Sequence, residues 1–317
     1  SALSGAILDP AIAWQLETGG QVRDEAVLLG DVTGDGASEY VFLVGGSVVV
    51  RRLDGALIWD TPAYGLTHLE AIADLNGDGT PELVARGAIF LVLDGLTGSP
   101  LWRLEGAAGQ PLRNSQAFVL NADEDPAPEV LFAIGNPVSM ALYDFASGWL
   151  DDQARQWTNE DPALPTSVYR PVVGRFTNEG MGQIAMLNQE GCRAVFIDLS
   201  TGITQRVTQA LTQGRFCYGL TQAHDLNADG LDELLFTGTQ GASQGWVGAC
   251  AYSYQRNDAL WCYDYAVGST ESTTLSPAGA VADVDGDGDV EFVTSVFHNT
   301  QEVGATQDGV DEPGRWA

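Results

Sequence analysis

The sequence predicts an all-β fold: a single β-propeller of six four-stranded blades that spans residues 1–317. Three observations lead to this prediction. A short acidic loop occurs six times, apolar strands and turn residues flank each copy, and helical periodicity is nearly absent. The loop starts lie about 43 to 58 residues apart, close to the period of propeller repeats, and four antiparallel strands make one blade. A seventh, diverged blade at the chain ends stays an open alternative.

The second repeat shows the expected strand order most clearly. Strands at 69–74 and 82–85 flank its acidic loop, and strands at 88–93 and 100–104 flank an Asp-Gly-Leu-Thr-Gly turn. Glycine accepts the positive φ of such turns, so these segments read as hairpins. The first repeat shows the same four strands, at residues 26–30, 40–44, 47–53 and 56–60.

Tryptophan recurs on the predicted fourth strand, at Trp59, Trp102, Trp157 and Trp261. Trp59 and Trp102 each lie 28 positions after the first aspartate of their loop, and this fixed phase predicts a packing position.

The N-terminal segment 11–17 reads as a fourth strand with no blade before it. The sixth repeat supplies strands at 278–283 and 291–297 and then becomes loop-like. We therefore expect the N-terminal strand to complete the last blade, which would remove exposed sheet edges.

Four of the acidic loops are nearly complete, and they begin at Asp31, Asp74, Asp225 and Asp283. Each carries oxygen-bearing side chains at positions 1, 3, 5 and 9 around a glycine turn, which suits a hard cation such as calcium. An EF-hand would need glutamate at position 12. The residues there are Phe42, Ala85, Phe236 and Thr294, so the EF-hand reading fails.

The segment Ala71-Ile-Ala-Asp-Leu-Asn-Gly-Asp-Gly-Thr-Pro-Glu-Leu-Val84 resembles the FG-GAP and VCBS-type repeats of integrin α-chain propellers and bacterial surface proteins. The resemblance covers six units and nearly the whole chain. It implies calcium bound by side chains at positions 1, 3, 5 and 9 and by the backbone carbonyl of position 7. The implied ligands are Asp31, Thr33, Asp35, Ala37 and Glu39; Asp74, Asn76, Asp78, Thr80 and Glu82; Asp225, Asn227, Asp229, Leu231 and Glu233; and Asp283, Asp285, Asp287, Asp289 and Glu291.

Two copies of the loop are degenerate. The third keeps the oxygen ligands but places Pro126 at the sharp turn, which leaves calcium binding there open; its ligands would be Asn121, Asp123, Asp125 and Glu129. The fourth has Arg175 at position 1 and Gln183 at position 9. We expect no metal in the fourth loop and an ion pair of Arg175 with Glu179 in place of the cation.

All six loops join the first and second strands of a blade, so we expect them on one face, where calcium would clamp the blades. The opposite face carries the longer connections, at 105–115, 159–167, 238–246 and 297–309. Variable loops on a rigid scaffold are common binding surfaces. The aromatic side chains that could bind a sugar or peptide there are Tyr64, Trp246, Phe297 and His298, although scattered exposed aromatics are an equal alternative.

Composition excludes several functions. A net charge of −29 argues against nucleic-acid binding, and no apolar run is long enough to span a bilayer. All 14 basic residues are arginine, which excludes Schiff-base chemistry. The spacing of Cys250 and Cys262 across a turn predicts a disulfide, whereas pairing of Cys192 with Cys217 stays open. Calcium and disulfides together predict an extracellular or cell-surface location.

Catalytic signals are weak, because the three histidines are isolated and no nucleophile elbow, zinc motif or P-loop is present. Three functions remain open. The first, which the sequence favours, is non-enzymatic recognition or adhesion with a glycan or protein ligand. The second is a polysaccharide-active enzyme, given the resemblance to some rhamnogalacturonan lyases. The third is a self-assembling subunit of a surface polymer.

Overall fold

The computed structural model describes residues 27–105, 115–123, 125–135, 138–164, 171–188, 192–211, 216–240, 246–266, 272–284, 286 and 290–299. Within the strands, this description leaves out the side chains of residues 216–221, 238–240, 246–248, 264–266, 272–279 and 294–299.

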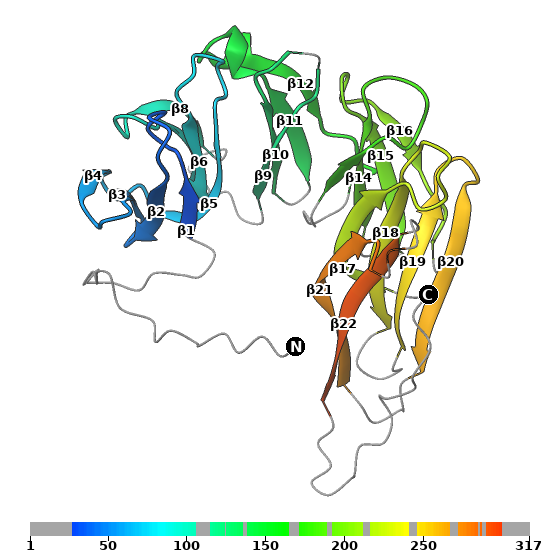
Figure 1. Ribbon diagram of the computed structural model, residues 1–317. Helices are drawn as coiled ribbons and strands as arrows, with labels where there is room; N and C mark the ends of the chain where they lie inside the picture. Colours follow the sequence, from blue (N-terminus) through cyan, green and yellow to red (C-terminus); the bar gives the residue numbers. More distant parts are fainter. Residues whose placement is uncertain are drawn as a thin grey trace, which may run out of the picture. The chain divides into compact units, whose positions relative to one another are not determined.

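The described chain is almost entirely β-structure, and each sheet follows chain order (Figure 1). The first sheet contains β1 (Val27–Gly30), β2 (Glu39–Val44), β3 (Ser47–Arg52) and β4 (Leu57–Asp60). The second contains β5 (Leu66–Ala73), β6 (Glu82–Gly87), β7 (Ile89–Asp94) and β8 (Pro100–Glu105). The third contains β9 (Gln116–Leu120), β10 (Glu129–Ile134), β11 (Ser139–Tyr143) and β12 (Arg155–Asn159).

The remaining sheets follow the same rule. The fourth contains β13 (Val172–Gly174), β14 (Gln183–Asn188), β15 (Arg193–Asp198) and β16 (Thr204–Val207). The fifth contains β17 (Phe216–His224), β18 (Glu233–Gln240), β19 (Trp246–Ser253) and β20 (Asp258–Ala266). The sixth pairs β21 (Ser272–Ala282) with β22 (Glu291–Asn299). Two short helices, η3 (Phe145–Ser147) and α1 (Asp151–Ala154), lie between β11 and β12.

The predicted all-β class and the four-strand repeat are confirmed for five sheets. Only two strands of the sixth are among the described residues. The N-terminal segment 11–17, expected to complete it, lies outside them, so closure of the last blade stays a prediction.

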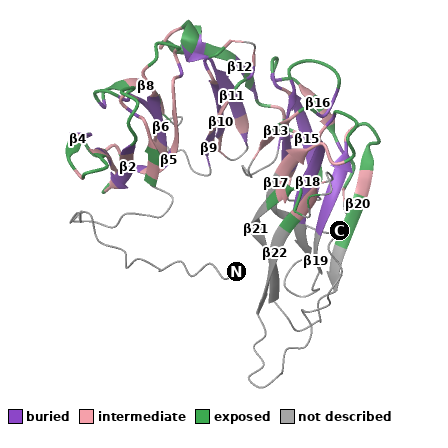
Figure 2. Cartoon of the chain, viewed as in Figure 1, coloured by how far each residue is buried: buried purple, intermediate pink, exposed green. Residues whose placement is uncertain are grey.

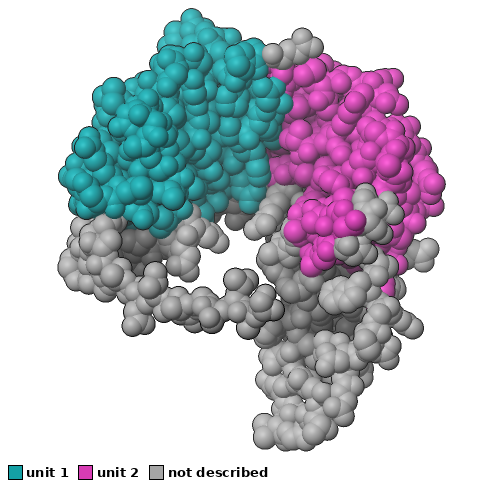
Figure 3. Space-filling model, viewed as in Figure 1, with its two compact units in different colours: residues 1–121, 125–132, 143–155 teal, residues 122–124, 133–142, 156–317 magenta. Residues whose placement is uncertain are grey.

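The middle strands of the sheets supply most of the core (Figure 2). β10 and β14, for example, are buried at five of six positions, as expected for strands covered on both faces. The chain divides into two compact units (Figure 3): residues 1–121, 125–132 and 143–155 form unit 1, and the rest form unit 2. One core cluster gathers around Leu83 and Leu91 in unit 1, and another around Phe196 and Phe236 in unit 2.

Two of the fourth-strand tryptophans bind their sheet to a turn of the next one. Trp59 Nε1 donates a hydrogen bond to the Gly95 carbonyl (2.8 Å), and Trp157 Nε1 donates to the Leu199 carbonyl (2.9 Å). A Cβ on Gly98 would lie 2.6 Å from the Trp59 ring, so only glycine fits beneath it. The packing role is confirmed for the three buried rings, Trp59, Trp102 and Trp157, whereas Trp261 is 38% exposed.

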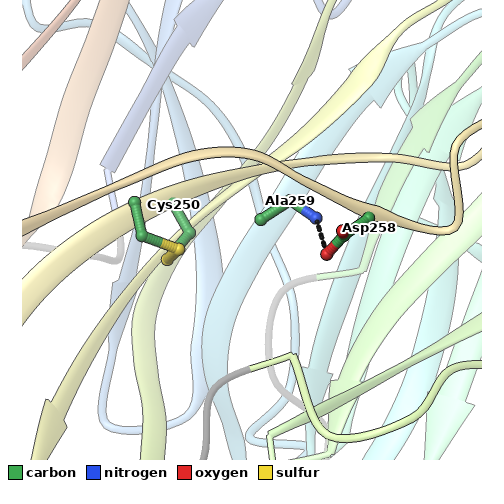
Figure 4. The surroundings of a disulfide bond; sticks show 4 residues. Cys250, Asp258 and Ala259 are labelled. Atoms are coloured by element: carbon green, nitrogen blue, oxygen red, sulfur yellow. Dashed lines mark hydrogen bonds between the residues drawn. A yellow bond between two sulfur atoms is a disulfide. The ribbon is translucent and has the colours of Figure 1, made fainter.

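The predicted disulfide between Cys250 and Cys262 is present, and it joins register partners on β19 and β20 (Figure 4). Their Cα atoms lie 4.1 Å apart. Close by, the Ala259 N–H donates to Asp258 Oδ1 (2.8 Å). Cys192 is buried and also disulfide-bonded. The side chain of Cys217, whose pairing with Cys192 the sequence left open, lies outside the described residues.

Candidate metal centres

The six acidic loops connect the first and second strands of their sheets, as predicted. In five of them the side chain at position 9 accepts a hydrogen bond from the N–H at position 2, so the start of the second strand is stapled to the end of the first. These bonds are Val32 to Glu39 (2.9 Å), Leu75 to Glu82 (2.8 Å), Phe176 to Gln183 (2.9 Å), Leu226 to Glu233 (3.1 Å) and Val284 to Glu291 (2.8 Å). We call this contact the position-9 staple.

The aspartate at position 1 organises the rest of each strong loop. Asp31 accepts hydrogen bonds from the backbone N–H groups of Gly34 (2.7 Å) and Gly36 (2.8 Å). Asp74, Asp225 and Asp283 accept equivalent bonds from their own loops. The chain can turn this tightly because Gly34 and Gly36 have φ of 72° and 87°. These bonds hold the acidic side chains inside a compact turn.

Several features of these loops fit a bound calcium ion. The donors are hard oxygens, as calcium requires. Thr33 Oγ1, an implied ligand of the first loop, is buried and has no hydrogen-bond partner among the described residues. In the second loop, Asn76, an implied ligand through its oxygen, donates its Nδ2 to Asp78 Oδ2 and Glu82 Oε1 (both 3.1 Å), while its Oδ1 accepts from the Asp78 N–H (2.8 Å). An amide N–H thus lies between two carboxylates. Calcium bound there would supply the positive charge that these side chains lack.

Burial of the position-9 glutamates has an electrostatic consequence. Burial raises the pKa of Glu82 to about 7; the Leu75 N–H opposes this shift, and the charges of Asp78, Asp74 and Asp94 add to it. Burial likewise raises the pKa of Glu233, while the Leu226 N–H again acts in the opposite direction. None of the ion pairs among the described residues includes Glu82 or Glu233. Within the part of the chain that the structure describes, these buried carboxylates therefore have no basic side-chain partner.

The third loop, which the sequence left open, brings its carboxylates closest together. One oxygen each of Asp123, Asp125 and Glu129 lie within 4.8 Å of one another, and no other such group occurs among the described residues. Asn121, the implied ligand at position 1, donates from Nδ2 to the Asp125 carbonyl (2.8 Å). In the sixth loop, Asp285, Asp287 and Asp289 lie outside the described residues.

The fourth loop has its interior filled by Gln183. The Gln183 Oε1 atom accepts from the N–H groups of Phe176 and Thr177 (2.9 and 3.1 Å). Its Nε2 donates to Thr177 Oγ1 (2.9 Å) and to the Glu179 carbonyl (3.2 Å). One side chain thus satisfies four polar groups that face the loop interior.

The expected ion pair of Arg175 with Glu179 is wrong, since none joins these two described residues. Gln183 already fills the loop, and the Arg175 backbone pairs with Asp232 of the next acidic loop. The Arg175 N–H donates to Asp232 Oδ2 (2.6 Å), and the Asp232 N–H donates to the Arg175 carbonyl (2.8 Å). Absence of metal from the fourth loop stays a prediction.

Neighbouring loops lie next to each other within each unit. In unit 1, a Cβ on Gly34 would lie 3.1 Å from the Gly79 carbonyl of the second loop. In unit 2, the Arg175–Asp232 pair joins the fourth and fifth loops. A groove of about 460 Å³ runs between β1 and β5 and includes the first aspartates of two loops, Asp31 and Asp74. The sequence did not predict this groove, because the ligand surface was expected on the face opposite the acidic loops.

The structure places the residues of the proposed aromatic ligand surface elsewhere than on the expected loops, while ligand binding by them stays a prediction. Tyr64 is half-buried against the core of unit 1, which is a packing role. Trp246 begins β19, and Phe297 and His298 lie within β22, so these three residues belong to strands and not to the expected loops. Gly238, expected to begin the connection at 238–246, pairs instead with Gly248 inside a longer hairpin. The side chains of Trp246, Phe297 and His298 lie outside the described residues.

Comparison with known proteins identifies the fold. No protein-family model matches this chain, and neither does any curated protein. Among solved structures, Sqt1 from Saccharomyces cerevisiae, a β-propeller, matches with 13% identity and a TM-score of 0.50 over 81% of this chain and 67% of its own. BamB from Moraxella catarrhalis matches with 15% identity and a TM-score of 0.46 over 89% of this chain and 77% of its own. The chain is therefore a β-propeller.

No helix among the described residues is long and apolar enough to cross a membrane.

Proposed function

We propose that this chain is a calcium-stabilised propeller that recognises a glycan or protein ligand outside the cell, without catalysing a reaction. In this proposal its acidic loops are calcium-binding repeats of the FG-GAP and VCBS type. The four strong loops each hold one ion, and the third is a candidate for a fifth.

One comparison carries the calcium proposal. Gln183 shows that the position-9 staple needs only an oxygen acceptor, because its amide forms that bond at 2.9 Å. Glu82 and Glu233 form the same bond but also bury a carboxylate that pairs with no basic side chain among the described residues. Burying an unpaired charge costs free energy, and the hydrogen bond of the staple does not require that charge. A bound cation would offset this cost, and we therefore assign the carboxylates to cation binding.

An extracellular location is supported by chemistry. The Cys250–Cys262 disulfide is typical of oxidising compartments. Calcium sites in extracellular modules operate at the roughly 10⁻⁴–10⁻³ M concentrations found there. A recognition role is supported by the scaffold, because propellers present loops from rigid blades.

Thermal unfolding of the full chain in calcium and in chelator tests the metal part of this proposal. At free calcium 100-fold above the dissociation constant, each site would add about 2.7 kcal/mol, so we expect a large fall in Tm with chelator. An unchanged melting curve would contradict calcium stabilisation.

Incubation with polysaccharides tests the non-enzymatic part. We expect binding without product release. Unsaturated sugar products would replace recognition with lyase activity, and regular self-association in solution would favour an assembly role.

A further inference from the structure

A second groove in unit 1 lies away from the acidic loops. It has a volume of about 440 Å³, within the range of small-ligand sites. Two segments about fifty residues apart in the sequence form it: the outer strand β8 and the residues between η3 and α1. The residues that matter here are Leu101, Arg103, Trp149, Leu150 and Asp151. We call it the β8 groove.

Trp149 gives the β8 groove a rigid aromatic wall. Its ring is half-buried and stacks on Phe145, with centroids 4.9 Å apart and an interplanar angle of 25°. Phe145 is fully buried and packs in turn against Trp102 and Tyr143. Trp149 is therefore the partly exposed end of a buried aromatic cluster. Leu150, next to it, is 60% exposed and extends the apolar surface.

Asp151 provides a fixed polar group beside this ring. The Tyr143 hydroxyl donates to Asp151 Oδ1 (2.7 Å), and Arg155 Nη1 lies 3.2 Å from Asp151 Oδ2. The Asp151 side chain is nevertheless about half exposed, so its remaining lone pairs can accept hydrogen bonds from a ligand. From β8, the exposed Arg103 guanidinium adds a set of donors and pairs with Glu105 at 3.3 Å.

The balance of charge indicates what the groove can bind. Each charged group here is matched by an opposite one, Arg103 by Glu105 and Asp151 by Arg155. Such a site does not select a strongly charged ligand, which would need an excess of one sign. It offers an apolar ring face, a fixed acceptor and a fork of donors. A pyranose ring has the complementary chemistry: one C–H face and a rim of hydroxyls.

Addition of a peptide strand fits the groove less well. β8 is the last strand in the order β5-β6-β7-β8 and carries Pro100, Arg103 and Glu105. Proline lacks the N–H that an added strand would use, and charged side chains on an edge oppose strand pairing.

We infer that the β8 groove binds a neutral pyranose oligosaccharide, with one sugar ring on Trp149 and its hydroxyls bonded to Asp151 and Arg103. This inference rests on the proposed recognition role and names both its ligand class and its site.

Calorimetric titration of the full chain in calcium buffer tests the inference. The probes are cellohexaose, maltohexaose, xylohexaose and chitohexaose, with hexagalacturonate as a charged comparison. We expect at least one neutral hexaose to bind. Trp149→Ala should weaken that binding about tenfold or more, because it removes the stacking surface. Trp149→Phe should keep affinity within a few-fold, and Trp261→Ala, at an exposed tryptophan in unit 2, should leave it unchanged.

The inference would be overturned if no neutral hexaose binds the folded protein at millimolar concentration, if only hexagalacturonate binds and added salt abolishes that binding, or if Trp149→Ala and Trp261→Ala weaken binding equally. If the protein binds a glycan or protein and Trp149→Ala does not weaken that binding, the β8 groove is not the binding site, although the proposed recognition role stands. Release of unsaturated products would contradict the proposed non-enzymatic function. The effect of Trp149→Ala on affinity would still test whether the β8 groove is the binding site.

Discussion

The second and fourth acidic loops solve the same structural problem with different chemistry. Both staple the position-2 N–H to a buried side chain at position 9, at 2.8 Å in one and 2.9 Å in the other. In the second loop that side chain is Glu82, surrounded by further acidic groups. In the fourth it is Gln183, whose amide donates into the loop interior. The fourth loop is thus internally satisfied, whereas the second is a loop in which we propose a bound cation.

This comparison separates two roles of position 9. The hydrogen bond to the backbone is common to both loops and does not require charge. The negative charge is present only where the other ligand positions also carry oxygen donors. Together with Arg175 in place of the aspartate at position 1, this carboxylate-to-amide difference distinguishes the fourth loop from the loops that we propose to bind calcium.

Removing the side chain at position 9 should have the largest effect. Glu82→Ala leaves the buried Leu75 N–H unpaired and deletes a proposed calcium ligand, so we expect the free energy of unfolding in calcium to fall by roughly 3 to 5 kcal/mol. Gln183→Ala should lower the free energy of unfolding by about 2 to 3 kcal/mol, and by the same amount in calcium and in chelator. Denaturant unfolding of both variants in both buffers measures this. An equal calcium response in the two variants would contradict the distinction between the loops.

Exchanging only the charge is a finer test. Glu82→Gln keeps an oxygen for the staple but removes the carboxylate, so we expect calcium to stabilise this variant by about 2.7 kcal/mol less than the parent. In chelator the variant should be at least as stable as the parent, since no unpaired charge is buried. Gln183→Glu is the matched change, and it should lower stability in chelator. A Glu82→Gln variant with the parent's full calcium response would refute the account of this loop.

The pH dependence of the calcium-free protein gives a smaller effect. The folded chain holds the Glu82 proton more tightly than the unfolded chain does, because its pKa is raised from the ordinary 4.5 to about 7. Stability from this group is present below pH 4.5 and is lost as the pH rises towards 7. We expect a loss of roughly 2 kcal/mol, reduced from the full linkage value by solvent screening. Unfolding in chelator at pH 5 and pH 8 should show this loss in the parent and not in Glu82→Gln.

Substitution of the buried tryptophans should reduce stability least, and by a similar amount in both units. Trp59→Phe and Trp157→Phe each remove one buried indole hydrogen bond, to Gly95 and Leu199, and should each cost about 1 kcal/mol. Calcium should not change either loss. If Trp59→Phe were calcium-sensitive and Trp157→Phe were not, the metal loops would be coupled to the turns of the sheets.

The repeat and its turns could be predicted because they depend on local chemistry. Glycine conformation predicts the Asp94-Gly-Leu-Thr-Gly turn, and apolar sequence patterns predict the strands around each acidic loop. Spacing from the acidic loops predicts the packed tryptophans, Trp59, Trp102 and Trp157. The Cys250–Cys262 disulfide was predictable for the same reason, since a hairpin brings its two strands together.

Other features depend on contacts between distant segments. The pairing of Gly238 with Gly248 turns an expected loop into a hairpin that carries Trp246. The partner of the Arg175 backbone is Asp232, 57 residues away, and no local pattern predicts it. The β8 groove joins Trp149 to a strand of the preceding sheet and has no sequence motif.

Counting the calcium ions bound per chain tests the central claim most directly. Equilibrium dialysis with radioactive calcium should find four ions in the parent, or five if the third loop binds, and one fewer in Glu82→Gln. An absence of bound calcium, or an unchanged count in Glu82→Gln, would contradict it.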